Sequence, residues 1–195
     1  MFDIFNNINL SIINSKQKIA FLYLLFILLI SYIAIKAQDK IPDKIIAGGK
    51  LEWSDYTGEI DKNSNYWATT KWYVHYKYKI IQFHGDTVKI DLQVWPALQG
   101  NSWVLPDKKT TELLQHEQGH FNFAMLLSLE FKKEAGSTVL LINNCDRKLD
   151  SIFNAALNNL KQMEIQYDDE TNHMLNRAEQ ERWNKKIAEM LKEAE

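Results

Sequence analysis

Apolar and polar residues alternate along two neighbouring stretches of the chain, residues 72–80 and residues 88–94. A period of two is typical of a β-strand that buries one face. Residues 84–87, His-Gly-Asp-Thr, separate the two stretches and have the composition of a tight turn. We therefore predict an antiparallel hairpin, and a shorter strand near residues 50–53 is compatible with the sequence. The apolar positions of the hairpin are Trp72, Val74, Tyr76, Tyr78 and Ile80 in the first strand and Val88, Ile90, Leu92 and Val94 in the second.

After Pro106 the apolar residues follow the spacing of a helix. Asp107 is suited to cap the start of this helix, which we expect to run to about Ala135, with Gly136 as its end. The apolar residues surround most of the helix axis, and this distribution indicates a helix that is buried on most sides. They are Leu113, Leu114, Phe121, Phe123, Ala124, Leu126, Leu127 and Phe131.

Two further helices are predicted in the last quarter of the chain. The second helix extends from Arg147 to about Ile165 and has one apolar face, and the third extends from about Met174 to the end. Strands in the first half and helices in the second predict an α+β fold, an N-terminal antiparallel sheet followed by a helical half. The apolar face of the second helix consists of Leu149, Ile152, Phe153, Ala156, Leu157, Leu160 and Met163.

The N-terminal segment differs from the rest of the chain. Lys16 and Lys18 precede an apolar run of 17 residues, residues 19–35, and Lys36-Ala37-Gln38 follows it. This order is typical of a secretory signal peptide or an N-terminal membrane anchor, and the length of the run fits either. We therefore predict that residues 1–37 are a signal peptide, cleaved after Ala37, or an anchor. In both cases residues 38–195 form the working domain and are exported, to the periplasm or the extracellular space.

Composition narrows the classes of function. The chain has 195 residues, of which 46% are hydrophobic, enough for one globular domain. Residues 38–195 contain 20 basic and 24 acidic residues, and this balance argues against nucleic acid as a partner. Cys145 is the only cysteine, so the sequence allows neither an intramolecular disulfide nor a cysteine-based zinc site. Any metal site must use His, Asp or Glu.

The segment His-Glu-Gln-Gly-His, residues 116–120, has the spacing of a metal site on a helix. His116 and His120 are one turn apart, so both imidazoles lie on one face and can bind one ion. Glu117 is rotated by about 100° from His116, so it is better placed to act on a water molecule at the metal than to bind the metal. There it can accept a proton from the water and pass it to a leaving amine. We predict one Zn²⁺ per chain, with Glu117 as catalytic acid and base.

Zinc in a catalytic site needs a third protein ligand. His173 is the preferred candidate, because it follows the second helix, where the chain can return across the first. Glu164 is the alternative, since it lies on the otherwise apolar face of the second helix and a buried carboxylate requires a cation. His75 and His84 rank lower, because a strand histidine beside a lysine and a histidine in a hairpin turn are usually solvated.

Three more residues have candidate roles at this site. Tyr167 is a candidate catalytic residue that donates a hydrogen bond to the oxyanion of a tetrahedral intermediate, although it could equally be an aromatic residue packed at a helix end. Asp168 could orient a ligand histidine. Gly119 is unfavourable inside a helix by about 1 kcal/mol relative to Ala, so we expect another element to pack closely against it.

Several motifs together resemble one known family, the bacterial predicted secreted zinc-dependent proteases grouped as domain of unknown function family 922. The motifs are Ser-Trp-Val at residues 102–104, Leu-Leu-Gln-His-Glu-Gln-Gly-His-Phe at residues 113–121 and Tyr-Asp-Asp-Glu-Thr-Asn-His at residues 167–173, followed by Gln180 and Trp183. They occur in family order and span most of residues 50–190. One departure is visible at residue 174, where the family usually has glycine and this chain has methionine.

The resemblance implies a zincin-like fold, with the His-Glu-x-x-His motif on the central buried helix. It also implies zinc at His116 and His120, Glu117 as the catalytic acid and base, and a role for the segment that ends at His173. The expected function is an exported zinc-dependent metallohydrolase, a peptidase acting on peptide or protein substrates. An enzyme that cleaves another amide, including cell-wall peptide, is the nearest alternative.

A non-catalytic exported domain that binds zinc is the alternative from a different class. Glu117 favours catalysis, because a structural zinc site does not need a carboxylate at that position.

Overall fold

A computed structural model of the chain describes residues 42–195, which belong to one compact unit, Ile41–Glu195. The predicted signal peptide or membrane anchor, residues 1–37, lies outside the described residues. Within residues 42–195, no helix is long and apolar enough to cross a membrane.

The predicted hairpin is confirmed, and both of its strands are longer than expected. β2, Trp72–His84, pairs antiparallel with β3, Thr87–Leu98, and β5, Leu140–Leu141, adds a short third strand beside β3. The turn falls at Gly85 and Asp86, and Gly85 has a φ of 58°, which glycine adopts without strain.

A second, two-stranded sheet lies near the other end of the hairpin. It consists of β1, Ala68–Thr69, and β4, Trp103–Val104, in antiparallel register. The short strand considered near residues 50–53 is not formed. Instead, one 3₁₀ turn, Ala47–Gly49, precedes this segment, and a second, Trp53–Asp55, begins at its last residue.

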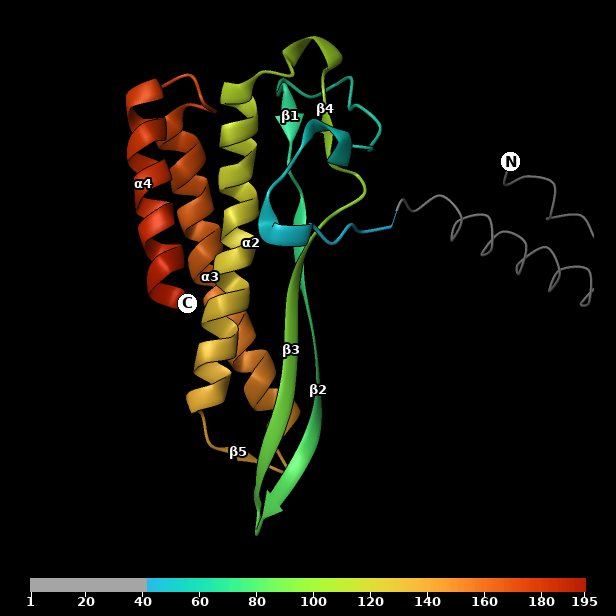
Figure 1. The fold of residues 1–195 in the computed structure, drawn as a ribbon, viewed down its shortest axis with the longest axis vertical. Coiled ribbons are helices and arrows are strands. Elements are labelled where there is room, and N and C mark those ends of the chain that lie inside the picture. The colour runs from blue at the N-terminus through green and yellow to red at the C-terminus, as the bar shows by residue number, and fades with distance from the viewer. Residues whose placement is uncertain (1–41) are drawn as a thin grey trace, which may run out of the picture. The chain divides into compact units, whose positions relative to one another are not determined.

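Three helices follow β1–β4, with β5 between the first two of them, and the predicted α+β class is confirmed (Figure 1). They are α2, Thr111–Ser137, α3, Cys145–Thr171, and α4, Arg177–Ala194. α2 contacts β2 and β3 as well as α3 and α4, so it is the central element of the fold. Its apolar residues are therefore buried on several sides, as their distribution in the sequence predicted.

The boundaries of α2 differ from the prediction at both ends. Thr110, not Asp107, is the N-cap, because its side chain accepts a hydrogen bond from the Leu113 N–H at 3.1 Å. Asp107 instead lies in a 3₁₀ turn, Pro106–Lys108, that precedes the helix. At the other end Gly136 does not terminate the helix, which continues to Ser137.

α3 begins two residues before the predicted Arg147 and ends at Thr171, six residues beyond the predicted end near Ile165. Tyr167 and Thr171 are both fully buried and extend the inner face of the helix by two more turns. Because α3 continues beyond Ile165, Asp168 lies on a helix that packs against α2.

The turn between α3 and α4 has an unusual backbone. Asn172, His173 and Met174 have φ values of 47°, 50° and 77°, a region that non-glycine residues rarely adopt. The third helix was predicted to begin near Met174, but this conformation delays its start to Arg177, with Asn176 as the N-cap. The positive φ of Met174 also gives a physical reason for the glycine usual at that position in the family that the chain resembles.

α3 packs directly against α2 at Gly119. A Cβ atom at this position would lie 2.3 Å from the hydroxyl oxygen of Tyr167 and 2.6 Å from its Cζ atom. The expectation that another element packs closely against Gly119 is therefore confirmed. Gly136 lies in the same helix, but a Cβ atom there would meet no atom within 4 Å.

These two glycines make a matched pair for a test of stability. Gly119→Ala should lower the free energy of unfolding by about 1–3 kcal/mol, because the overpacking of a tight interface outweighs the better helix propensity of alanine. Gly136→Ala should raise it, by at most about 1 kcal/mol, because only the propensity changes. Urea unfolding of the purified protein measures both. Equal effects of the two substitutions would contradict the close packing at Gly119.

Candidate metal centre

The two histidines of the central motif lie together on α2. His116 and His120 are one turn apart, and their Nε2 atoms are 3.3 Å from each other. Glu117 lies between them in sequence and is buried, as is His116. The arrangement predicted from the helical spacing, two imidazoles directed at one point, is present in the structure.

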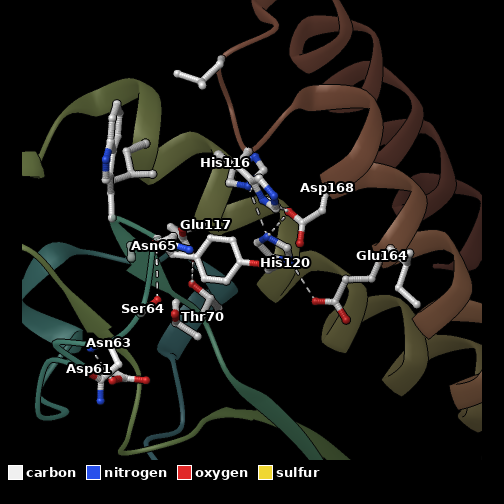
Figure 2. Close-up of a pocket in the computed structure, with 18 residues that line it drawn as sticks. Asp61, Asn63, Ser64, Asn65, Thr70, His116, Glu117, His120, Glu164 and Asp168 are labelled. Atoms are coloured by element: carbon white, nitrogen blue, oxygen red, sulfur yellow. Dashed lines mark hydrogen bonds and ion pairs between the residues drawn. The ribbon is translucent and has the colours of Figure 1, made fainter.

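A carboxylate from α3 completes a triangle of donor atoms. Oδ1 of Asp168 lies 3.2 Å from Nε2 of His116 and 3.1 Å from Nε2 of His120 (Figure 2). Ligand atoms about 2.0 Å from a tetrahedral zinc ion are separated from one another by roughly 3.3 Å. The three observed separations match this value, so His116, His120 and Asp168 could hold one metal ion.

The other nitrogen of each ring is held by a side chain behind the site. Nδ1 of His116 lies 2.9 Å from Oε1 of Gln180, and Nδ1 of His120 lies 2.9 Å from Oε1 of Glu164. Trp72 Nε1 donates to the same Glu164 oxygen at 2.8 Å. If each Nδ1 carries the proton, each Nε2 presents a lone pair toward Asp168, and this tautomer is the one that metal-binding histidines use.

The charges at the site favour a cation. Oδ1 of Asp168 is buried and accepts no hydrogen bond from the described residues, although two ring nitrogens are close to it. Burial acts to raise the pKa of Asp168, but the imidazoles of His116 and His120 outweigh burial and hold that pKa well below its usual range. Burial likewise disfavours a charged His120, yet the carboxylates of Asp168, Glu164 and Glu117 raise its pKa well above the usual value. A partly buried group of acids that attracts positive charge fits a divalent metal ion.

His173, the preferred third ligand from sequence, lies beside this cluster and not within it. Its Nδ1 atom is 3.4 Å from Oδ1 of Asp168, and 46% of its side chain is exposed. The ring makes an edge contact with Tyr66, with the centroids 4.9 Å apart. Glu164, the alternative ligand, contacts His120 from behind, through Nδ1. The residue that joins the two histidines is Asp168, which the sequence analysis had placed behind a ligand.

Tyr167 is buried behind the site. Its hydroxyl donates to the backbone oxygen of His116 at 2.9 Å and accepts from Nε2 of Gln180 at 2.8 Å, and its ring stacks on the His116 ring with centroids 4.8 Å apart. Because these contacts occupy the hydroxyl, they favour a role in positioning His116 over the donation to an oxyanion that was considered from sequence.

The candidate ligands open onto a cleft of about 880 Å³. Residues 61–70 form one wall, α2 contributes its motif, and α3 with the following turn forms the opposite side (Figure 2). His75 and His84 do not line the cleft. His75 lies on β2 with Nε2 3.4 Å from a carboxylate oxygen of Asp43, and His84 is at the hairpin turn, consistent with their low ranking.

Two contributors to the site were not assigned from sequence. Gln180 of α4 is buried and contacts both His116 and Tyr167. Thr70, which follows β1, donates a hydrogen bond to Oε2 of Glu117 at 2.5 Å. Gln180 belonged to the motifs that carried the family resemblance, but nothing in its spacing identified its partner. Thr70 gave no signal, because only the fold brings it to α2.

Comparison with protein families gives one match. Residues 52–174 match a family described as bacterial protein of unknown function (DUF922). The matched range includes the motif on α2 and Asp168, and it ends before Gln180. Neither the curated proteins nor the solved structures that were compared match the chain. Since the match covers well over half of its 195 residues, this chain belongs to the DUF922 family.

Proposed function

We propose that this protein is a zinc-dependent hydrolase that cleaves amide bonds, with peptides or proteins as substrates. The observation that carries the proposal is the convergence of three donor atoms, from His116, His120 and Asp168, at the separations of tetrahedral ligands. Two nitrogens and one carboxylate oxygen are ligand types that zinc accepts in catalytic sites, where a fourth position stays open. The motif helix beside an antiparallel sheet also supports our proposal of a zincin-like fold.

Each residue has a defined task in this proposal. Zinc would supply Lewis acidity, which makes a water molecule more acidic and polarises a substrate carbonyl. Glu117 accepts the proton of the attacking water and transfers it to the leaving nitrogen. Gln180 and Glu164 fix the rings of His116 and His120, so that the ligand nitrogens do not have to reorganise.

The cleft and Glu117 support catalysis over a purely structural zinc site. A structural site is closed by four protein ligands, whereas these three donors line an open cleft of about 880 Å³ that can accept a peptide. The apolar run at residues 19–35 further supports the proposal that the enzyme works outside the cytoplasm, in the periplasm or beyond it. There it would be free, or tethered by this run to the membrane.

The choice between Asp168 and His173 as third ligand is open to a direct test. Asp168→Ala should weaken zinc binding by at least about tenfold, because one of three protein ligands is lost. His173→Ala should change zinc affinity much less, since its ring lies beside the three donor atoms and not among them. Competition titration with a chromogenic chelator gives both dissociation constants. The reverse order would assign the third ligand to His173, as the sequence first indicated.

Glu117→Gln separates an enzyme from a zinc-binding module. The substitution keeps the size of the side chain but removes its ability to accept a proton, so zinc should remain bound while turnover falls by about 100-fold or more. Cleavage of an internally quenched peptide library, with metal content measured in parallel, gives both quantities. An unmodified protein that binds stoichiometric zinc but cleaves no peptide would support the non-catalytic alternative.

Zinc binding should release protons near neutral pH. Without zinc, the carboxylates around His120 raise its pKa and favour the protonated ring, which must lose a proton to present a lone pair to the ion. The apparent affinity for zinc should therefore rise with pH until the pH passes the pKa of His120. Calorimetry in two buffers with different ionisation enthalpies counts the released protons. Release of none at pH 7 would contradict a protonated His120.

A further inference from the structure

A chain of two hydrogen bonds leads from the interior of the fold to the carboxylate of Glu117. The hydroxyl oxygen of Tyr56 lies 2.6 Å from Oγ1 of Thr70, and Oγ1 of Thr70 lies 2.5 Å from Oε2 of Glu117. All three side chains are buried. They come from separate parts of the chain, because Tyr56 follows the 3₁₀ turn Trp53–Asp55, Thr70 follows β1 and Glu117 is on α2.

The donor and acceptor in each of these two hydrogen bonds follow from the number of hydroxyl protons available. An ionised carboxylate only accepts hydrogen bonds, so Thr70 must donate its single hydroxyl proton to Glu117. Thr70 can then only accept from Tyr56, which therefore acts as the donor. Burial, together with the negative charge of Glu117, raises the pKa of Tyr56, so its phenol keeps the proton that it donates.

These hydrogen bonds make the two carboxylate oxygens of Glu117 unequal. Oε2 is held by Thr70, whereas Oε1 accepts no hydrogen bond from residues 42–195. Both Thr70 and Glu117 line the cleft that contains the two histidines (Figure 2). A carboxylate fixed through one oxygen can rotate little, and its other oxygen remains available to a water molecule in the cleft.

We propose that Thr70, supported by Tyr56, is a positioning residue that holds the carboxylate of Glu117 toward the nucleophilic water. This inference rests on the proposed function of Glu117 as a general base. Without that role, the same hydrogen bonds would only satisfy a buried acid, and their loss would affect folding stability but not one step of the reaction.

Thr70→Val gives the sharpest test, because valine has nearly the same shape and lacks the hydroxyl. In the zinc-loaded protein, kcat should fall by about tenfold or more, the scale for losing a hydrogen bond to a charged group, while KM and the zinc dissociation constant stay close to the parent values. Thr70→Ser should restore kcat, and Tyr56→Phe should give a smaller loss. Thr87→Val, the same change at the hairpin turn, is the control and should have no effect.

A metal-directed ligand tests the same contact without a known substrate. Acetohydroxamic acid would lose its hydroxyl proton on binding to zinc held by His116, His120 and Asp168, and Glu117 would receive that proton. Thr70→Val should weaken acetohydroxamate binding several-fold, and Glu117→Gln should weaken it at least as much. In the double variant, Thr70→Val should add nothing to the loss, because there is no carboxylate left to position.

The outcomes separate this inference from the proposed function. If Glu117→Gln weakens acetohydroxamate binding but Thr70→Val does not, the positioning role of Thr70 is wrong and the function of Glu117 stands. If Glu117→Gln has no effect on binding or turnover, the proposed role of Glu117 is wrong, and the role of Thr70 with it. A parent protein that binds no zinc would overturn both.

Discussion

The candidate metal centre depends on the close approach of α3 to α2 at Gly119. Without a side chain at this position, the Tyr167 hydroxyl reaches the backbone of α2 and donates to the His116 oxygen. The next residue of α3, Asp168, thereby lies close enough to contact both His116 and His120. Glu164, one turn earlier on the same face of α3, reaches His120 from the other side. The contact between α2 and α3 at Gly119 therefore positions two side chains of α3. One is Asp168, a candidate ligand, and the other is Glu164, which holds the ring of the candidate ligand His120.

The elements that packed against α2 also supply the polar groups that a buried site requires. α4 contributes Gln180 to His116, α3 contributes Glu164 to His120, and β2 contributes Trp72 to Glu164. Each of these groups is tied to another protein group, so the cost of burying them is offset by hydrogen bonds. Oδ1 of Asp168 is the exception, and this is the atom that a metal ion would satisfy.

The parts of the structure set by local spacing were predictable from sequence, and those set by helix packing were not. His116 and His120 share a face whatever surrounds the helix, and the hairpin follows from alternation and its turn. Asp168 was not considered as a ligand, because α3 was expected to end near Ile165. That expectation left residues 167–173 as a loop and made His173 the residue with the greatest reach. Tyr167 follows Leu160 by seven residues, which is two helical turns, and both side chains are buried on the same face. This continued helical period was the signal in the sequence that α3 extends beyond Ile165.

His116 contacts the neutral amide of Gln180, whereas His120 contacts the carboxylate of Glu164. The net charge of the site gives a reason for this difference. Glu117, Glu164 and Asp168 bring three carboxylates to a largely buried region, so one zinc ion would leave a single net negative charge. A carboxylate in place of Gln180 would add a second negative charge at a position with no exposed surface. The neutral amide still accepts from His116 and also donates to Tyr167, which a carboxylate cannot do. Gln180 therefore links the candidate ligand to the tyrosine that sets the spacing of α2 and α3, and it does so without adding charge.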